Sequence, residues 1–506
     1  MNTQIRRLTI AMLVLFGFLF LRLNQVQVLQ AADYNRRPDN SRQVEADFDK
    51  PRGTISSIDG TVLARSVATS GKLKYQREYP TNDLFAHVVG TYSLTYGSDG
   101  VERSYDDALT GRLAQLQLKG FANPFVERSS AGNVILTLRA DVQQVAKEQL
   151  GNRKGSIVAL DPRTGGIIAM WSYPSFDPNP PSSNDPKTAR GSRVLLQASP
   201  DKPLLAKSYR DRFFPGSTFK IVTATGGLES GKVTTTSPVF PVMTSYTPPL
   251  TTKAISNFDG APCGGALFQI IKVSCNSAFA QMGAEVLGPD PMISAAERFG
   301  FNRSVPIDLP APARSFFPTD FGKRVRAGAT PGSADVYENT PALAQAAIGQ
   351  NDVSATPLQM ALVAAAVANG GTIMTPHVMD HIEDSEGTTV KTYEQNVWSN
   401  VLSQANALTL QQAMIGVVQG GTATRAAIPG FVVGAKTGTA QVGTDPPRSH
   451  VWTIAFAGPP GQAPVIAVAV MVEGQPGYSE QTGGKVAAPI AQAVMKAALS
   501  VPPKGH

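Results

Sequence analysis

The longest apolar stretch of the chain lies near its N-terminus. Two arginines precede an uncharged run over 8–21, and apolar positions continue past Arg22 to Leu29. Because Arg22 can place its charge at the interface along an aliphatic stem, residues 8–29 are long enough to cross a bilayer. The following residues lack the small pair that a cleavage site needs, which disfavours a removed signal peptide. We expect an uncleaved single-pass anchor at 8–29, with residues 1–7 in the cytoplasm and the rest of the chain outside the plasma membrane.

The pattern after the anchor contains only short periodic pieces. Strand-like or helical runs lie at 54–55, 61–63, 101–109, 133–138 and 140–150. The runs at 101–109 and 140–150 have helical spacing, and the other three are typical of strands. Short elements of this kind, without a compact motif, predict a small accessory domain over 30–154.

A different pattern begins at Gly155. Strand-like apolar runs lie at both ends of the remaining chain, at 156–160, 167–171, 431–433, 451–457 and 464–472. The chain between them is largely helical, for example over 357–367, and an apolar helix over 486–499 follows the last strand run. Strands from both ends around a helical middle predict one α+β domain with an antiparallel sheet over 155–500.

Composition narrows the class of protein. Of the 506 residues, 16% are charged and 42% are hydrophobic, which argues against a disordered chain and a coiled coil. The net charge of +7 is small for this length, and no basic run with interleaved aromatic residues occurs, so we expect no nucleic-acid partner. The two cysteines, Cys263 and Cys275, are too few for a disulfide scaffold. Outside the cell they can form one disulfide, and two free thiols are the alternative.

The first candidate catalytic motif is Ser217-Thr-Phe-Lys220. It opens an apolar helical stretch that we expect to end at Gly226-Gly227. Residues three apart share one face of a helix, so the Lys220 amine is expected to reach the Ser217 hydroxyl. A neutral lysine can take the proton of a serine nucleophile, and burial beside a second cation lowers its pKa toward this role. A second copy, Ser199-Pro-Asp-Lys202, is flanked by prolines that exclude a regular helix.

The second candidate motif is Ser274-Cys275-Asn276. It lies in apolar surroundings, whereas the similar Ser182-Ser183-Asn184 lies in a loop-like stretch rich in Pro, Ser and Asp. A hydroxyl at Ser274 could relay a proton to a leaving amine. The Asn276 amide could hold a substrate carbonyl or the Lys220 ammonium.

The third candidate motif, Lys436-Thr437-Gly438-Thr439, follows a strand-like run over 430–435. A strand of this sequence presents Lys436 and Thr437 beside a cleft. The missing side chain of Gly438 leaves room for a substrate backbone along the strand edge.

In this order and separation, the three motifs resemble those of the penicilloyl-serine transferases, above all the class B penicillin-binding proteins. Further similar segments lie along nearly the whole chain, at 52–55, Glu102, Tyr105, 155–161, 177–179, 214–220, 349–350, 355–360, 436–441 and 451–452. Chain size and the segment 421–424 are most similar to the actinobacterial penicillin-binding protein A group. The resemblance implies a serine β-lactamase-like transpeptidase domain, with an antiparallel five-stranded sheet flanked by helices, and a pedestal or dimerisation-like accessory domain.

The resemblance also implies a reaction. Ser217 would attack the D-Ala–D-Ala bond of a peptidoglycan stem peptide, or a β-lactam that mimics it, with Lys220 as the base. The backbone N–H groups of Ser217 and Thr439 would form the oxyanion hole. An amine of a neighbouring strand would then take the acyl group, which completes a cross-link.

Supporting roles follow from the same resemblance. Ser274, Asn276 and Lys436 would move protons and shape the electrostatics of the site. Substrate, including its terminal carboxylate, would be bound along Thr437, Gly438 and Thr439. Cys275 in the middle of the second motif departs from the simple pattern, and a disulfide there would either stiffen the site or disturb it.

Other functions share these motifs: D,D-carboxypeptidase or endopeptidase, β-lactamase, lactam sensor, and a scaffold with a vestigial site. No glutamate can be assigned to the fast deacylation that a β-lactamase needs, and the anchor and accessory domain exceed what a hydrolase requires. The region before Gly155 is too short for a glycosyltransferase, so the resemblance suggests a SEDS-type lipid II glycosyltransferase as partner. His377 and His381 are four apart but lack the glutamate of a zinc motif, and we expect neither a metal nor a cofactor.

Overall fold

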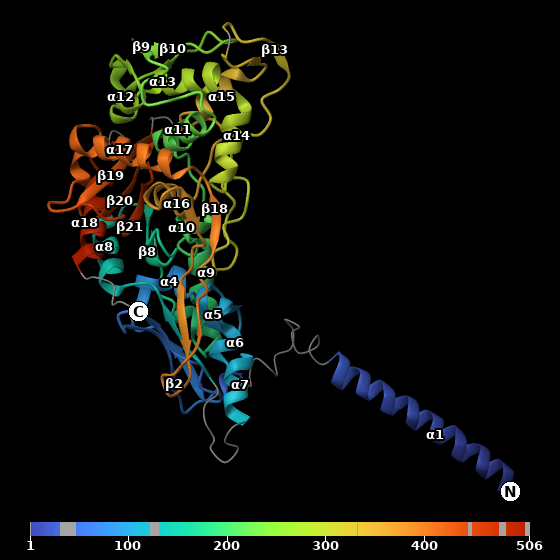
Figure 1. Ribbon diagram of the computed structural model, residues 1–506. Coiled ribbons are helices and arrows are strands. Elements are labelled where there is room, and N and C mark those ends of the chain that lie inside the picture. Colours follow the sequence, from blue (N-terminus) through green and yellow to red (C-terminus); the bar gives the residue numbers. More distant parts are fainter. Residues whose placement is uncertain are drawn as a thin grey trace.

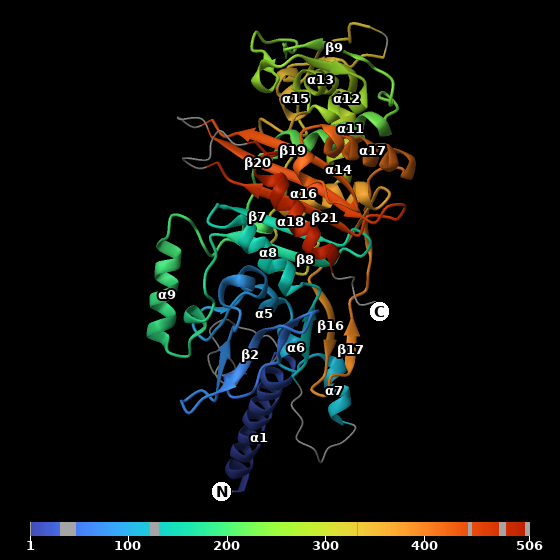
Figure 2. The same ribbon diagram turned by 90° about the vertical axis from the view of Figure 1, so that its left-hand side faces the viewer.

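The computed structural model describes residues 2–30, 47–121, 131–330, 332–443, 448–474 and 482–500. In both ribbon views the body of the protein is elongated, with three tiers (Figures 1 and 2). An N-terminal module lies at the bottom, a five-stranded sheet in the middle and a group of helices at the top. Helix α1 is seen apart from all three in Figure 1.

Helix α1 (Asn2–Asn24) continues into a π-helical turn, η1 (Gln25–Leu29). Together they contain a helical span, Thr3–Gln27, that is long and apolar enough to cross a membrane. No other part of the described protein covers the apolar side chains of α1, as expected for a helix whose apolar surface contacts lipid. Among the described residues this is the one helix with that length and composition.

The N-terminal module is built on a six-stranded sheet. Its strands in spatial order are β17 (Thr389–Thr392), β16 (Met379–Glu383), β6 (Asn133–Leu136), β1 (Ile55–Ser57), β2 (Val62–Ala68) and β3 (Tyr75–Glu78). Strands β1 and β6 are parallel, and the other neighbours are antiparallel. Strands β16 and β17 come from the later part of the chain, so the region expected at 155–500 sends one hairpin into this sheet.

Short elements cover the module. They are η2 (Asn82–Phe85), α4 (Ala86–Val89), β4 (Tyr92–Ser93), β5 (Gly97–Ser98), α5 (Gly100–Ser104), α6 (Asp106–Leu109) and α7 (Ala114–Phe121). At its centre the carboxylate of Glu102 is fully buried and pairs with Arg52 and Arg77, each at 2.6 Å. A buried carboxylate is tolerated because two guanidinium groups satisfy its oxygens.

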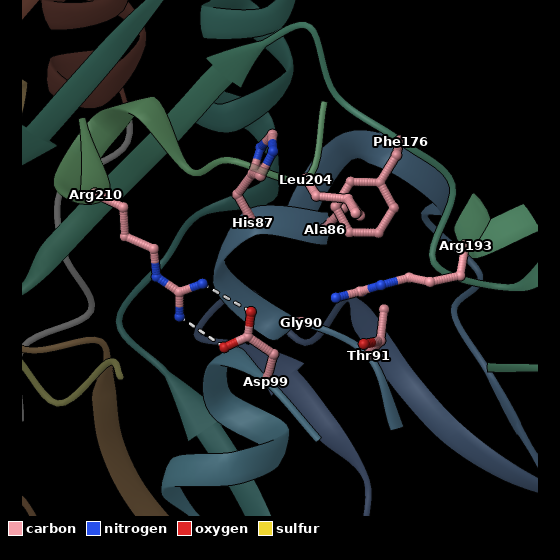
Figure 3. A pocket seen from close by; sticks show the side chains of 9 residues that line it. All are labelled: Ala86, His87, Gly90, Thr91, Asp99, Phe176, Arg193, Leu204 and Arg210. Carbon is pink, nitrogen blue, oxygen red and sulfur yellow. Dashed lines mark hydrogen bonds and ion pairs between the residues drawn. The ribbon is translucent and has the colours of Figure 1, made fainter. Parts of the chain in front are cut away.

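Ionic and hydrogen-bonded contacts join the module to the rest of the protein. Asp99 accepts two hydrogen bonds from Arg210, at 2.6 and 2.8 Å, beside a cavity of about 120 Å³ (Figure 3). The hydroxyl of Tyr105 donates to Asp308, which also accepts from the backbone N–H groups of Val378 and Met379 at the start of β16. The hairpin of β16 and β17 is thereby fixed at the junction.

The middle tier is an antiparallel five-stranded sheet, as the resemblance implied. Its strands in spatial order are β19 (Val432–Gln441), β20 (Ser449–Gly458), β21 (Ile466–Val472), β7 (Gly155–Leu160) and β8 (Ile167–Tyr173). Each strand overlaps one of the runs predicted from the apolar pattern, so those predictions are confirmed. Every residue of β7 and β21 is buried, because helices cover both faces of the sheet.

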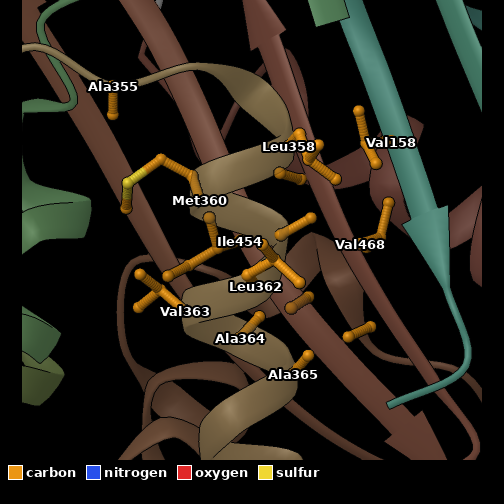
Figure 4. Packing of buried hydrophobic residues seen from close by; sticks show 14 of the residues in the cluster. Val158, Ala355, Leu358, Met360, Leu362, Val363, Ala364, Ala365, Ile454 and Val468 are labelled. Atoms are coloured by element: carbon orange, nitrogen blue, oxygen red, sulfur yellow. The ribbon is translucent and has the colours of Figure 1, made fainter. Parts of the chain in front are cut away.

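Helices α8 (Ala140–Leu150) and α18 (Ala487–Ser500) pack together against the sheet. Helix α16 (Pro357–Ala368) lies along the strands, with its side chains packed among theirs (Figure 4). All its residues are buried, and its many alanines let the helix approach other elements closely. Helix α8, which falls within the accessory domain expected at 30–154, packs on β8 and α18.

The remaining elements form the upper tier and its connections, except η3 and α9, which lie beside the N-terminal module (Figure 2). The helices and turns are η3 (Pro180–Ser182), α9 (Pro186–Ala198), α10 (Lys207–Arg210), η4 (Gly216–Phe219), α11 (Lys220–Glu229), η5 (Phe258–Gly260), α12 (Leu267–Lys272), α13 (Asn276–Gln281), η6 (Met282–Leu287), α14 (Pro289–Arg298), α15 (Thr340–Ala346), α17 (Gln404–Gly420) and η7 (Thr424–Ala426). Short strands pair as β9 (Phe240–Met243) with β12 (Cys263–Gly265), β10 (Ser245–Tyr246) with β11 (Ile255–Ser256), β13 (Arg324–Arg326) with β14 (Val336–Tyr337), and β15 (Thr372–Met374) with β18 (Val397–Asn400).

Candidate active site

The Pro-Gly-Ser turn before α11 is held from two sides. The Gly216 N–H donates to the Gly349 carbonyl at 2.9 Å, and a Cβ at Gly349 would lie 2.2 Å from the Gly216 oxygen. Only a glycine fits there, and its φ of 72° is also one that glycine adopts freely. The indole N–H of Trp452, on β20, donates to the Phe214 carbonyl at 3.0 Å. These contacts fix Ser217 at the edge of the sheet.

Helix α11 carries Lys220 as its first residue and buries it completely. The prediction that this helix ends at Gly226-Gly227 is wrong, because it continues to Glu229. The two glycines serve close packing instead. A Cβ at Gly226 would lie 3.0 Å from the Pro291 oxygen, and one at Gly227 would lie 2.7 Å from Val233.

Ser274 lies in the turn between α12 and α13 with a φ of 60°, a left-handed conformation that is unfavourable for a residue with a Cβ. The turn meets the buried amine of Lys220. Lys220 Nζ donates to the Ser274 carbonyl at 2.7 Å and to Asn276 Oδ1 at 2.6 Å, and it lies 3.3 Å from Ser274 Oγ. The Asn276 side chain in turn donates to the Ser256 carbonyl at 2.9 Å.

Strand β19 brings a second buried lysine to the same serine. Lys436 Nζ donates to Ser274 Oγ and to the Thr437 carbonyl, both at 2.8 Å. The structure therefore brings the three motifs together, with two lysine amines on the hydroxyl of Ser274. Residues 220, 274 and 436 lie far apart in the sequence, and the packing of α11, the Ser274 turn and β19 joins them.

The two lysines have strongly perturbed pKa values. Burial lowers the pKa of Lys220 well below its ordinary value, and the neighbouring Lys436 charge lowers it further. Burial also lowers the pKa of Lys436, to about 7. Two ammonium groups this close, away from water, are unfavourable together. The arrangement favours a neutral Lys220, which is the form that can accept a proton.

The predicted contact between Ser217 and Lys220 is not a hydrogen bond in the structure. Among the residues that the structure describes, Ser217 Oγ has no hydrogen-bond partner, and the Lys220 amine is directed to Ser274 and Asn276. The spacing of Ser217 and Lys220 on one helix face led us to expect that the Lys220 amine reaches the Ser217 hydroxyl. The partners of Lys220 depend on a turn more than 50 residues later in the chain.

Strand β19 lies directly against the turn that carries Ser217. A Cβ at Gly438 would lie 2.8 Å from the Pro215 oxygen and 3.0 Å from Thr218 Cγ2, and one at Gly216 would lie 2.8 Å from the Thr439 oxygen. The expectation that Gly438 leaves room for substrate is wrong for this face of the strand. The missing side chain lets the strand approach the turn, which places the Thr439 backbone next to Ser217.

The loop before α12 contains features that the sequence left open or did not reveal. Cys263 and Cys275 form a disulfide. Asn257 accepts a hydrogen bond from the Ser277 N–H at 2.8 Å and is buried. Its sequence context, Ser-Asn-Phe-Asp-Gly, is that of an ordinary turn and carries no signal for this role.

A further contact at the site lies after α17. The Thr422 hydroxyl lies 2.6 Å from that of Thr437, and nothing in the sequence indicated this contact.

The other motif copies and the two histidines considered as a metal motif, His377 and His381, lie elsewhere. Asn184 donates to the Tyr75 carbonyl of β3 in the N-terminal module, so the Ser182 copy is part of an interface there. The Ser199 copy ends at Lys202, which has a φ of 50° and is exposed. His377 stacks on Tyr393. His381 lies in β16 and contacts Asp380 and Glu383.

Family models match both parts of the chain. The penicillin-binding protein transpeptidase domain matches residues 155–496, and the penicillin-binding protein A dimerisation domain matches residues 52–135. The first match alone covers more than half of the chain. The protein therefore belongs to the penicillin-binding protein transpeptidases, which confirms the resemblance seen in the sequence.

Relatives and solved structures agree with this placement. The chain is 36% identical to the peptidoglycan D,D-transpeptidase PbpA of Mycolicibacterium smegmatis, over 99% of both chains, and 35% identical to that of Mycobacterium tuberculosis, over 99% of this chain and all of the relative. The ceftriaxone acyl-enzyme of M. tuberculosis penicillin-binding protein A superposes with a TM-score of 0.79 at 35% identity, over 90% of this chain and all of that one. The structure of Pseudomonas aeruginosa PBP2 superposes with a TM-score of 0.71 at 29% identity, over 89% of this chain and 96% of that one.

Proposed function

We propose that the protein is a peptidoglycan D,D-transpeptidase that works through an acyl-enzyme on Ser217. The observation that carries this proposal is that two buried lysines, Lys220 and Lys436, converge on Ser274, while the hydroxyl of Ser217, three residues before Lys220, has no hydrogen-bond partner among the described residues. Its substrates are stem peptides ending in D-Ala–D-Ala, and β-lactams acylate the same serine. Family membership and the relatives' acyl-enzyme structures support this assignment.

The first step is acylation. Ser217 Oγ attacks the carbonyl carbon of the penultimate D-Ala, and its proton passes to the lone pair of neutral Lys220. A neutral amine has two N–H donors, and the Ser274 carbonyl and Asn276 Oδ1 occupy both at 2.7 and 2.6 Å. The third position of the amine, its lone pair, then lies toward Ser274 Oγ at 3.3 Å and takes the proton of Ser217 as that hydroxyl approaches. Backbone N–H groups of Ser217 and Thr439 stabilise the oxyanion that forms.

Collapse of the tetrahedral intermediate breaks the peptide bond. The leaving D-Ala nitrogen takes a proton through Ser274, whose hydroxyl is held by Lys436 at 2.8 Å. Thr437, with its hydroxyl 2.6 Å from Thr422, and Thr439 bind the terminal carboxylate, while Gly438 keeps the strand close to the nucleophile. An amine from a neighbouring strand then attacks the acyl-enzyme, releases Ser217 and forms the cross-link.

We also propose the topology and one partner. Residues 1–7 lie in the cytoplasm, 8–29 span the membrane, 30–154 form the accessory domain and 155–500 carry the transpeptidase on the outer side. Arg6 and Arg7 at the start of the apolar helix support this orientation. A polymerase of the SEDS-type lipid II glycosyltransferase class would supply the glycan strands that this enzyme cross-links, because the chain shows no glycosyltransferase motif of its own.

Labelling with a fluorescent penicillin tests the proposed reaction. We expect the wild-type protein to form a stable adduct over hours and Ser217→Ala to form none. Equal labelling of the variant would refute the nucleophile assignment, and rapid loss of label from the wild type would indicate a β-lactamase. Product analysis with and without an acceptor amine separates a transpeptidase, which forms the cross-linked product, from a carboxypeptidase, which releases D-Ala only.

A further inference from the structure

A cavity of about 120 Å³ lies where the N-terminal module, helix α9 and helix α10 meet (Figure 3). Its polar lining comes from all three parts of the chain and consists of His87, Thr91, Asp99, Arg193 and Arg210. An apolar cavity of about 150 Å³ can hold a benzene molecule, so this one has room for a group of about five heavy atoms.

The charged groups that line the cavity do not balance. Arg210 is neutralised by Asp99, which accepts hydrogen bonds from it at 2.6 and 2.8 Å. Burial lowers the pKa of His87 to about 4, so its imidazole is neutral near pH 7. Arg193 forms no ion pair with any described residue, and a guanidinium keeps its charge in proteins. The cavity therefore carries one uncompensated positive charge.

Two side chains at the cavity have donors without partners. The side chain of Arg193 extends into the cavity between Phe176 and Thr91 (Figure 3), and its buried Nε has no hydrogen-bond partner among the described residues. Its guanidinium carbon lies 5.5 Å from the ring centroid of Tyr96, a contact that uses none of its N–H groups as hydrogen-bond donors. Thr91 is 6% exposed, and no described residue accepts from or donates to its hydroxyl. Buried donors of this kind are normally satisfied, so their presence here indicates an acceptor that the protein itself does not supply.

We propose that this cavity binds a small oxyanion, the phosphate or carboxylate group of a ligand, through the Arg193 guanidinium and the Thr91 hydroxyl. An oxyanion accepts from both donors and also balances the charge of Arg193. The planar guanidinium can donate two N–H groups to two oxygens of one such group. A neutral ligand would satisfy the donors but leave the charge uncompensated. This site is separate from Ser217 and does not depend on the proposed reaction there.

A bound oxyanion would connect α9 to the N-terminal module. Ala189 is the one buried residue of α9, all of whose residues the structure describes, and the helix packs mainly on η3. Arg193 comes from α9 and Thr91 from the module, so a single anion bound to both holds the helix against the module. Because this arrangement exists only in the folded protein, the anion stabilises the fold increasingly as its concentration rises.

The test is the melting temperature of the full-length protein in detergent, measured against increasing inorganic phosphate and, separately, acetate. Sodium chloride at the same ionic strength is the reference, because it screens charges equally. The two anions distinguish a phosphate-bearing from a carboxylate-bearing ligand. We expect at least one of them to raise the melting temperature of the wild type above the chloride reference. Arg193→Ala should need about tenfold more of that anion for the same rise.

Arg190→Ala is the matched control, because Arg190 lies one turn earlier on α9, is exposed, and loses the same charge. General effects of phosphate or acetate on protein stability act on both arginine variants alike, so we expect this control to respond as the wild type does. Thr91→Val removes only the hydroxyl on the module side, and it should weaken the response about fivefold.

The response to anion concentration separates binding from a structural role of Arg193, which would lower the melting temperature equally in all three salts. If neither anion raises the melting temperature of the wild type above the chloride reference, the inference is wrong. It is also wrong if Arg193→Ala and Arg190→Ala respond equally, because the effect is then a general one. Failure of the proposed function would appear separately, as penicillin labelling of Ser217→Ala.

Discussion

Replacing Asn276 by aspartate tests whether Lys220 acts as the base. Asn276 Oδ1 lies 2.6 Å from Lys220 Nζ, so Asn276→Asp puts a carboxylate in place of a neutral acceptor at the same contact. The wild-type pKa of Lys220 is lowered by burial and by Lys436. A negative charge beside the amine opposes both effects, because it stabilises the ammonium form.

The size of the effect follows from the distance. At an effective dielectric constant of about 20, unit charges about 3–4 Å apart attract by about 4–6 kcal/mol. Desolvation of the new carboxylate offsets part of this energy, and an opposite charge this close shifts a pKa by about 1–3 units. The pKa of Lys220 rises accordingly. Below that pKa, the neutral fraction of Lys220 falls about tenfold per unit.

The assay is the second-order rate constant for acylation by a fluorescent penicillin, measured from about pH 6 to 10, which reports the ionisations of the free enzyme. The base must be neutral, so the rate rises with pH through the pKa of Lys220. A raised pKa moves this rising limb to higher pH, and the variant approaches the wild-type rate only under alkaline conditions.

Asn276→Ala is the matched control for the aspartate variant. Like the aspartate variant, it loses the 2.9 Å hydrogen bond that Asn276 donates to the Ser256 carbonyl. It also removes the oxygen that accepts from Lys220, and it adds no charge. We expect this variant to be acylated slowly, but we expect the rising part of its pH–rate profile to stay at the wild-type pH. If the limbs of the two variants coincide, the carboxylate does not act through the protonation of Lys220, and the assignment of Lys220 as general base is wrong.

Three further substitutions test other parts of the structure. Gly438→Ala adds a Cβ 2.8 Å from the Pro215 oxygen, and we expect about a 100-fold loss of acylation rate with a small change in melting temperature; a normal rate would contradict this. Thr422→Val removes the hydroxyl 2.6 Å from that of Thr437, which should weaken β-lactam binding about fivefold, or about 1 kcal/mol, in a titration of acylation rate against concentration. Glu102→Gln removes the carboxylate that two buried arginines share, and only Arg52 keeps another, that of Asp106; it should lower the free energy of unfolding by about 3–5 kcal/mol in urea, whereas an unchanged midpoint would show that the network is not stabilising.

The apolar pattern was sufficient to predict the elements whose burial it reflects. The strands of the five-stranded sheet and helices α16 and α18 overlap the apolar runs that predicted them, and α8 lies where helical spacing predicted it, because a buried strand or helix needs apolar residues on every covered face. The hairpin of β16 and β17 was not predicted. Its pairing partner, β6, lies about 250 residues earlier in the chain, and no local pattern specifies so distant a register.

Predictions for the site were limited in the same way. Motif order was enough to select Ser217, Lys220, Ser274 and Lys436 as the residues to examine, because each motif is short and local. The orientation of the Lys220 amine was not predictable, since its acceptors at the Ser274 turn are set by the packing of α11 against a distant segment. Gly438 shows a second limit. A missing side chain indicates a close approach, but the sequence does not say whether substrate or the protein itself makes it.

The charges of the proposed site balance only when the substrate is included. Among the described residues, no carboxylate contacts the amine of Lys220 or Lys436, and both side chains are fully buried. An unpaired buried cation is unfavourable, and the lowered pKa of Lys220 favours its neutral form in the free enzyme. A substrate whose terminal carboxylate lies along Thr437 and Thr439 brings a negative charge next to Lys436. That charge favours the protonated form of Lys436, whose repulsion in turn keeps Lys220 neutral. In the proposed mechanism, recognition of the carboxylate and activation of Ser217 are therefore coupled through the two lysines that contact Ser274.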